Sequence, residues 1–193
     1  MANFIDEFMK TLGPTVAKEL SSKMKIDQKT AQKLIPQIAP LILGGLKKQK
    51  DEFGGADRVD HILNKYGSAS ALDNIAGIFS KGVKEKNPDP ALGGLLGDSG
   101  LQAVSLLTKQ FNLKGDQVKQ LIPMLAPIIL GSLSKKRDAD GAGSSGIAAL
   151  LDQDGDGSIL DDVAGFLMKG AGSSKGSGGL LGGLIGGLLK KRR

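Results

Sequence analysis

The chain of 193 residues contains no cysteine, no tryptophan, one tyrosine and one histidine. Without cysteine it can form no disulfide framework and perform no thiol chemistry, although this absence does not identify a compartment. A serine nucleophile needs a positioned base and oxyanion donors. The segment around Ser99 resembles a nucleophile motif, but Ser99 is better explained as the N-cap of a helix from Leu101. The only histidine, His61, is expected on an exposed helix surface beside Asp60, so we expect no enzyme.

Long hydrophobic runs are also absent. The longest nearly apolar stretches span 12 or 13 residues, below the roughly 18 that cross a bilayer: Leu34–Leu46, Leu121–Leu133 and Gly178–Leu189. The amino terminus, MANFIDEFMK, has acidic residues where a signal peptide needs a basic start and an apolar core. We therefore expect a cytoplasmic protein without a transmembrane helix.

The positive charge is concentrated at one end of the chain. The formal net charge is +6, and the terminal KKRR contributes four of these charges, which leaves 6 − 4 = +2 on the other residues. General affinity for nucleic acid is only weakly indicated. A DNA-associated regulatory protein is kept as the alternative function, because short helices can present lysines to phosphates. The available cations are Lys23, Lys25, Lys47, Lys48, Lys50, Lys135, Lys136 and Arg137.

The most informative feature that is present is an internal repeat. LIPQIAPLILGGLKK, from Leu34 to Lys48, returns as LIPMLAPIILGSLSK from Leu121 to Lys135, with ten of fifteen positions identical at an offset of 87. Downstream, Val59–Gly82 aligns with Ile147–Gly170. This predicts a tandem duplication of a unit of about 75 residues, which is marginal when folded alone, so the copies should pack together.

The repeat divides the chain into four parts. Residues 1–82 form the first predicted repeat, 83–94 a linker containing NPDPALGG, 95–170 the second repeat, and 171–193 a basic tail rich in glycine and leucine.

Apolar residues recur at helical spacing, and no sustained alternation of period two appears, so the expected fold class is all-α. Helices are expected over 3–12, from Pro14 to near 25, over 56–65 and over 71–81, with Asp27 and Asp116 as N-caps. The repeated core helix should be buried. Its two prolines predict a kink, with a break near Pro36, Pro40 in the next first turn and a stop around the Gly44 pair.

The LIPxxAPxILGxL core, followed by LLDQDGDGSILDDVAGFL, resembles the bacterial YidB-like family, a domain of unknown function numbered 937. The resemblance covers both copies, roughly residues 9–170. It implies an all-helical, homeodomain-like fold in a bacterial protein, and it implies no established activity or catalytic residue.

The strongest chemical motif lies in the second repeat and matches the first eight positions of a calcium loop. Three alternate carboxylates can converge on a hard cation, Gly157 permits the turn and Ser158 can offer its carbonyl. Position twelve is Val163 instead of glutamate, so Asp161 and Asp162 ligate only if the loop is short. The first copy has no acid triad here, and the alternative is a solvated turn. The candidate Ca²⁺ ligands are Asp152, Asp154, Asp156, Ser158, Asp161 and Asp162.

The tail GGLLGGLIGGLLKKRR, from Gly178, repeats with period four. A helix of this pattern would carry a smooth glycine strip beside a leucine ridge, which permits close contacts. Glycine is a poor helix former in water, so ordering requires an apolar partner. The terminal cations favour an anionic membrane surface, and a partner helix or self-association is the second option. A flexible solubilising tail remains the third.

Together these features predict a non-enzymatic binding or scaffolding protein. Its partner would be another protein, a second copy of the chain or a membrane surface, with nucleic acid less favoured.

Overall fold

The computed structural model describes residues 2–141 and 143–152. These residues form α-helices and one 3-10 helix, and no strand occurs among them. The predicted all-α class is therefore confirmed. The elements are α1 (Ala2–Thr11), α2 (Gly13–Met24), α3 (Gln28–Phe53), α4 (Gly55–Tyr66), η1 (Ala69–Asn74), α5 (Ile75–Gly82), α6 (Asp98–Phe111), α7 (Gly115–Asp140) and α8 (Gly143–Asp152).

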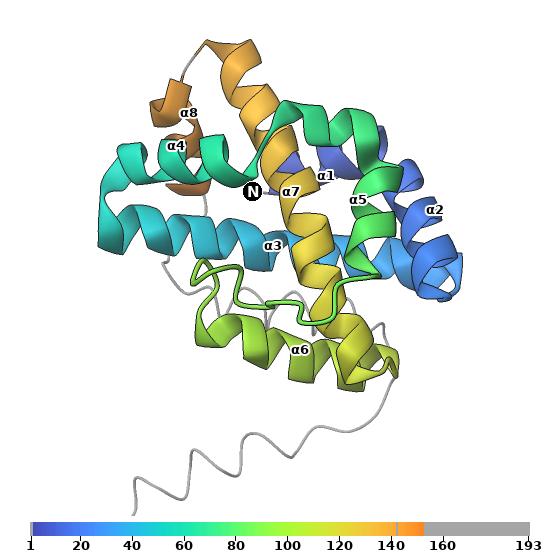
Figure 1. The fold of residues 1–193 in the computed structure, drawn as a ribbon. Coiled ribbons are helices and arrows are strands. Elements are labelled where there is room, and N and C mark those ends of the chain that lie inside the picture. Colours follow the sequence, from blue (N-terminus) through green and yellow to red (C-terminus); the bar gives the residue numbers. More distant parts are fainter. Residues whose placement is uncertain (1, 142, 153–193) are drawn as a thin grey trace, which may run out of the picture.

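Two helices of 26 residues, α3 and α7, contact each other across the centre of the molecule (Figure 1). α2, α4 and α6 pack on α3, while α4, α5, α6, α8 and η1 pack on α7. Residues from α1 to α8 share one hydrophobic cluster, including Phe8, Ile42, Phe79 and Ile129. Elements from both halves of the chain therefore build a common core.

Both long helices run without interruption through their two prolines, so the predicted break near Pro36 is wrong. A proline removes one N–H from the helix ladder and costs roughly 3 kcal/mol or more in a helix interior. Burial offsets this loss, because each large apolar side chain taken out of water contributes about 1.5–3 kcal/mol. Leu34, Ile35, Ile38, Ile42, Leu43 and Leu46 of α3 are fully buried.

The predicted stop at the glycine pair is also wrong, because α3 continues to Phe53. Gly45 is the point where the chain before α6 crosses this helix. A Cβ on Gly45 would lie 2.8 Å from the Leu95 carbonyl oxygen. This glycine permits close approach of another backbone instead of ending the helix.

The helix ends agree with the expectations in part. Asp27 caps α3, and its Oδ1 accepts a hydrogen bond from the Thr30 N–H at 2.9 Å. The expected cap Asp116 instead lies in the first turn of α7, where the N-cap is Lys114. Gly97, and not Ser99, is the N-cap of α6.

The helix expected over 71–81 divides into η1 and α5. Asn74 separates the two, because its side chain accepts a hydrogen bond from the Gly77 N–H at 3.0 Å and so caps α5. Ile75 and Phe79 are buried as expected, whereas Leu72 is only partly buried.

Several features recur at the offset of 87 residues that separates the sequence repeats. α3 begins at residue 28 and α7 at 115 (115 − 28 = 87). The residues closing α2 and α6, Lys25 and Asn112, both adopt left-handed backbone conformations with φ of 55° and 51°. The C-caps of α3 and α7 are Gly54 and Gly141.

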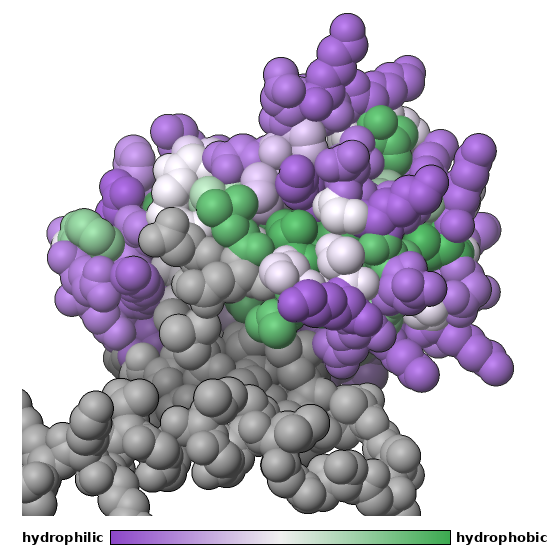
Figure 2. Space-filling model, turned by 90° about the horizontal axis from the view of Figure 1, so that it is seen from below, coloured by the Kyte–Doolittle hydropathy of each residue, from purple (hydrophilic) through white to green (hydrophobic). Residues whose placement is uncertain are grey.

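No helix in the described part of the chain is long and apolar enough to cross a membrane. On the side of α6, apolar side chains interrupt a largely hydrophilic surface (Figure 2). Leu101 and Leu106 of α6 are 57% and 46% exposed. The molecule therefore presents apolar surface on this side as well as charge.

Candidate functional site

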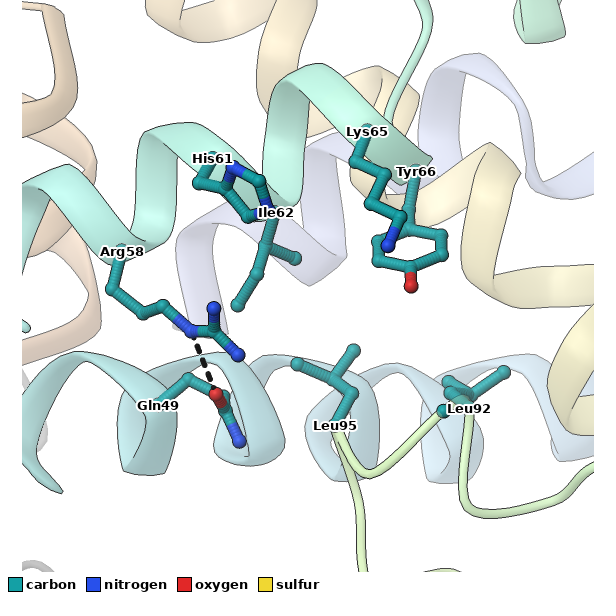
Figure 3. Close-up of a pocket in the computed structure, with 9 residues that line it drawn as sticks. Gln49, Arg58, His61, Ile62, Lys65, Tyr66, Leu92 and Leu95 are labelled. Atoms are coloured by element: carbon teal, nitrogen blue, oxygen red, sulfur yellow. Dashed lines mark hydrogen bonds between the residues drawn. The ribbon is translucent and has the colours of Figure 1, made fainter. Parts of the chain in front are cut away.

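A pocket of about 120 Å³ opens between α3, α4 and the chain segment before α6 (Figure 3). We call it the α4 pocket. Most of its polar groups come from α4, and its apolar side chains come from α4 and from the segment before α6, whereas α3 contributes Gln49. Its lining residues are Gln49, Arg58, His61, Ile62, Lys65, Tyr66, Leu92, Gly93 and Leu95.

The chain reversal at Gly54 and Gly55 sets α4 against α3. Both glycines have positive φ, 138° and 63°, a region that L-residues rarely adopt. The Gly54 N–H donates to the Lys50 carbonyl and closes α3. α4 then returns along α3 (Figure 1). Glycine at both positions therefore positions the wall that carries the basic side chains.

The basic residues of the pocket follow the helical repeat of α4. Arg58, His61 and Lys65 are spaced i, i+3 and i+7, which places them on one helical face. Ile62, from the same turn as His61, is 3% exposed and belongs to the core. One face of α4 thus carries basic groups above apolar contacts with α3.

Two contacts hold the polar side chains in place. Arg58 Nε donates to Gln49 Oε1 at 2.9 Å, which links α4 to α3. Lys65 Nζ lies 5.1 Å from the centre of the Tyr66 ring, within the range of a cation–π interaction. In Figure 3 the guanidinium of Arg58 points into the space between α4 and α3, and the Tyr66 hydroxyl points toward Leu92.

The third wall is formed by the end of the predicted linker, Leu92 and Gly93, and by Leu95 at the start of the predicted second repeat. Asp89 organises it, because its two carboxylate oxygens accept hydrogen bonds from the N–H groups of Ala91 at 2.8 Å and Gly93 at 2.6 Å. Leu92 has a positive φ of 53°, and the two glycines that follow it also have positive φ, 63° and 94°. This turn brings Leu95, which is 7% exposed, against α3.

No acidic residue lines the α4 pocket. Asp60, one residue before His61, instead accepts from Arg137 Nη1 of α7 at 2.8 Å. The hydrogen bond to Asp138, and next that to Asp60, raise the pKa of the Arg137 guanidinium. A carboxylate of α4 is therefore neutralised by a neighbouring helix, and the pocket keeps a surplus of basic groups.

The cations considered for DNA contacts are largely engaged with carboxylates. The hydrogen bond from Lys47, and next that from Lys50, lower the pKa of Asp51. The ion pairs, with their N···O distances, are Lys47–Asp51 at 2.8 Å, Lys50–Asp51 at 3.1 Å, Lys48–Glu52 at 4.0 Å and Lys136–Glu7 at 3.0 Å.

The predicted calcium turn falls almost entirely outside the described residues. Asp152 is the last residue of α8. Asp154, Asp156, Ser158, Asp161 and Asp162 lie beyond that point, as does the glycine-leucine tail. Within 2–141 and 143–152, no cluster of three potential metal ligands occurs.

The α4 pocket was not predicted from the sequence, although His61 lies on an exposed helix surface as expected. One signal was available: three basic residues at i, i+3 and i+7, followed by the only tyrosine of the chain. The approach of residues 92–95 to this face is tertiary and has no comparable sequence signal.

Comparison with known proteins identifies one family. The profile of "Bacterial protein of unknown function (DUF937)" matches residues 6–136, more than half of the chain. Neither curated proteins nor solved structures give a significant match.

Proposed function

Because the chain belongs to this bacterial family of unknown function, its role must be argued from its own surface, and we propose that it is a non-enzymatic binding or scaffolding protein. The observation that carries the proposal is the α4 pocket, where basic, aromatic and apolar groups meet on helices that share the common core. Sites held on rigid helices keep their geometry when a partner binds.

A polypeptide partner fits this surface better than nucleic acid. Several of the candidate DNA-contacting cations are paired with carboxylates, so their charge is partly neutralised. Leu101 and Leu106 of α6 are exposed as well and offer a partner apolar contacts outside the pocket. A DNA-associated regulatory role remains the alternative.

Photo-crosslinking in living bacteria tests the proposal. Tyr66→benzoylphenylalanine keeps an aromatic ring at the pocket, and the same residue at exposed Lys18 of α2 is the matched control. We expect an adduct from position 66, absent from position 18, that protease destroys and nuclease leaves intact. A nuclease-sensitive adduct would support the DNA alternative, and no adduct at position 66 would contradict the proposal.

We further propose that the chain arose by tandem duplication and is a YidB-like member of the family. The recurrence of helix starts and caps at the offset of 87 residues supports duplication. So does the matching of helix contacts, since α2 packs on α3 as α6 packs on α7, and α4 packs on α7 as α8 packs on α3. An experimental structure whose halves fail to superimpose would contradict it.

Two accessory roles rest on the sequence alone. We propose Ca²⁺ binding by Asp152 to Asp162, and contact of the tail with an anionic membrane surface or a partner. Calorimetric titration of calcium-free protein tests the first, and the absence of heat at millimolar Ca²⁺ would contradict it. Flotation with anionic liposomes tests the second, and equal flotation of a chain ending at Gly170 would contradict it.

A further inference from the structure

We propose that the α4 pocket recognises a carboxylate on a short apolar stem, presented by an acidic segment of a partner polypeptide. This inference rests on the proposed binding function and specifies the group that the site selects.

The basic side chains that line the pocket support the assignment of a carboxylate as the bound group. Arg58, His61 and Lys65 are the basic side chains of α4 that line the pocket, and none of the nine lining residues is Asp or Glu. Two carboxylates adjoin these residues in sequence, Asp57 before Arg58 and Asp60 before His61. Neither lines the pocket, and Asp60 is bound by Arg137. An anionic group entering the pocket therefore meets opposite charge without a competing carboxylate in the lining.

The geometry of Arg58 favours a planar anion. Its Nε is occupied by Gln49, which orients the guanidinium, and Figure 3 shows the terminal amino groups directed into the pocket. An arginine held in this way can offer two parallel N–H donors to a carboxylate. Lysine, with a compact charge, offers no such fork.

The apolar side chains of the lining would contact the apolar stem that carries the carboxylate. Ile62 and Leu95 are almost fully buried, and Leu92 packs against the same cluster. A methylene chain attached to the carboxylate would pack against these side chains and so be removed from water. This burial contributes about 0.8 kcal/mol of binding free energy per CH₂ group. The combination selects an acid with an apolar neighbour over a free inorganic anion.

The size of the pocket indicates a side chain and not a whole cofactor. Its volume of about 120 Å³ is well below that of pockets for drug-sized ligands, roughly 300–1,000 Å³. One helical turn beyond Gln49, Phe53 is 59% exposed and offers apolar surface to the rest of a bound chain. An acidic residue within a polypeptide, with further contacts outside the pocket, satisfies both observations.

Tyr66 provides a direct readout, because the chain has no other tyrosine and no tryptophan. The probes are hexanoate and its neutral analogue hexanamide, titrated into the full chain at constant ionic strength. Tyr66 fluorescence would be followed together with the NMR signals of the His61 ring and the amides of 58–66 and 92–95. We expect saturable changes with hexanoate and at least about tenfold weaker binding of hexanamide.

Substitutions separate charge from packing. Arg58→Gln should weaken hexanoate binding about tenfold and leave hexanamide binding unchanged. Arg58→Lys, which keeps the charge without the fork, should give an intermediate loss and serves if Arg58→Gln does not fold. Lys119→Gln is the matched control, since it removes an exposed cation of α7 outside the pocket, and should bind as the wild type does.

The outcomes distinguish this inference from the proposed function. Equal binding of hexanamide and hexanoate would overturn carboxylate selection while a pocket for a partner stands. Absence of any saturable response to hexanoate would also overturn it, whatever the crosslinking result. Failure of crosslinking at position 66 would instead count against the partner-binding function itself.

Discussion

Gly67 lies where the end of α4 meets the middle of α7. A Cβ at this position would be 2.7 Å from the Leu130 carbonyl oxygen and 2.8 Å from Ser134 Oγ, closer than real side chains approach. We expect Gly67→Ala to lower the free energy of unfolding by about 1–3 kcal/mol, because the two helices must separate. Urea denaturation measures this change.

Gly115→Ala is the matched control. Gly115 begins α7, and nothing lies within 4 Å of the position of its Cβ. Alanine there should be neutral or stabilising by about 0.4–1 kcal/mol, since it restricts the unfolded chain. Equal losses at both positions would show that close helix approach is not the cause.

Asp27 makes the cap of α3 dependent on pH. Hydrogen bonds from the Thr30 side chain, and next from the Thr30 backbone, lower its pKa. A lowered folded-state pKa stabilises the protein above the unfolded-state pKa, and this stability is lost as pH falls through the folded-state value. Asn also caps helices but does not titrate in this range.

We therefore expect Asp27→Asn to be less sensitive than the wild type to acid between neutral pH and about pH 3. Thermal unfolding of both proteins across this range, followed by circular dichroism, tests the expectation. Parallel curves for the two proteins would contradict it.

At the scale of elements, Arg137 ties α7 to α4. Its Nη1 donates to Asp60 Oδ1 at 2.8 Å and to Asn64 Oδ1 at 3.0 Å, and its side chain is 14% exposed. A double-mutant cycle with Arg137→Met and Asp60→Asn should give a coupling energy of about 1 kcal/mol, because the pair is partly shielded from water.

The pair Lys119–Asp116 is the control for this cycle. It is exposed and longer, at 3.5 Å, so its coupling should stay below about 0.3 kcal/mol. Equal coupling energies for the two pairs would contradict the expectation that shielding from water strengthens the Arg137–Asp60 pair.

The positions of the helices were largely predictable, because apolar residues recur at the helical period and the helix face that they form is buried. Val59, Ile62 and Leu63 of α4 are buried as the spacing required. The break predicted near Pro36 of α3 was wrong. The effect of proline on a helix was judged from the lost backbone hydrogen bond alone, without the stabilisation that burial of the whole helix provides. Residues such as Gly45 have a role that only the neighbouring backbone reveals.

The pocket was less predictable, since its walls come from segments more than 25 residues apart in sequence, such as 58–66 and 92–95. The face of α4 could have been identified from Arg58, His61 and Lys65. The opposite wall of the pocket, at Leu92, depends on a turn stabilised by Asp89 and on left-handed backbone conformations. The sequence pattern alone specifies neither of them.

At the scale of the whole molecule, the two halves complete each other. The Leu130 carbonyl meets Gly67 of the first half, and η1, α4 and α5 all pack on α7. A chain containing only the first half would expose these contacts to water. A unit of this size is marginal even when its core is complete.

The central claim is that both halves fold as one body, from which the α4 pocket is built. Urea denaturation of the full chain and of residues 1–86, followed by circular dichroism, tests it most directly. We predict a single cooperative transition for the full chain and no cooperative transition for residues 1–86. A cooperative transition of residues 1–86 at the same urea midpoint as the full chain would contradict the claim.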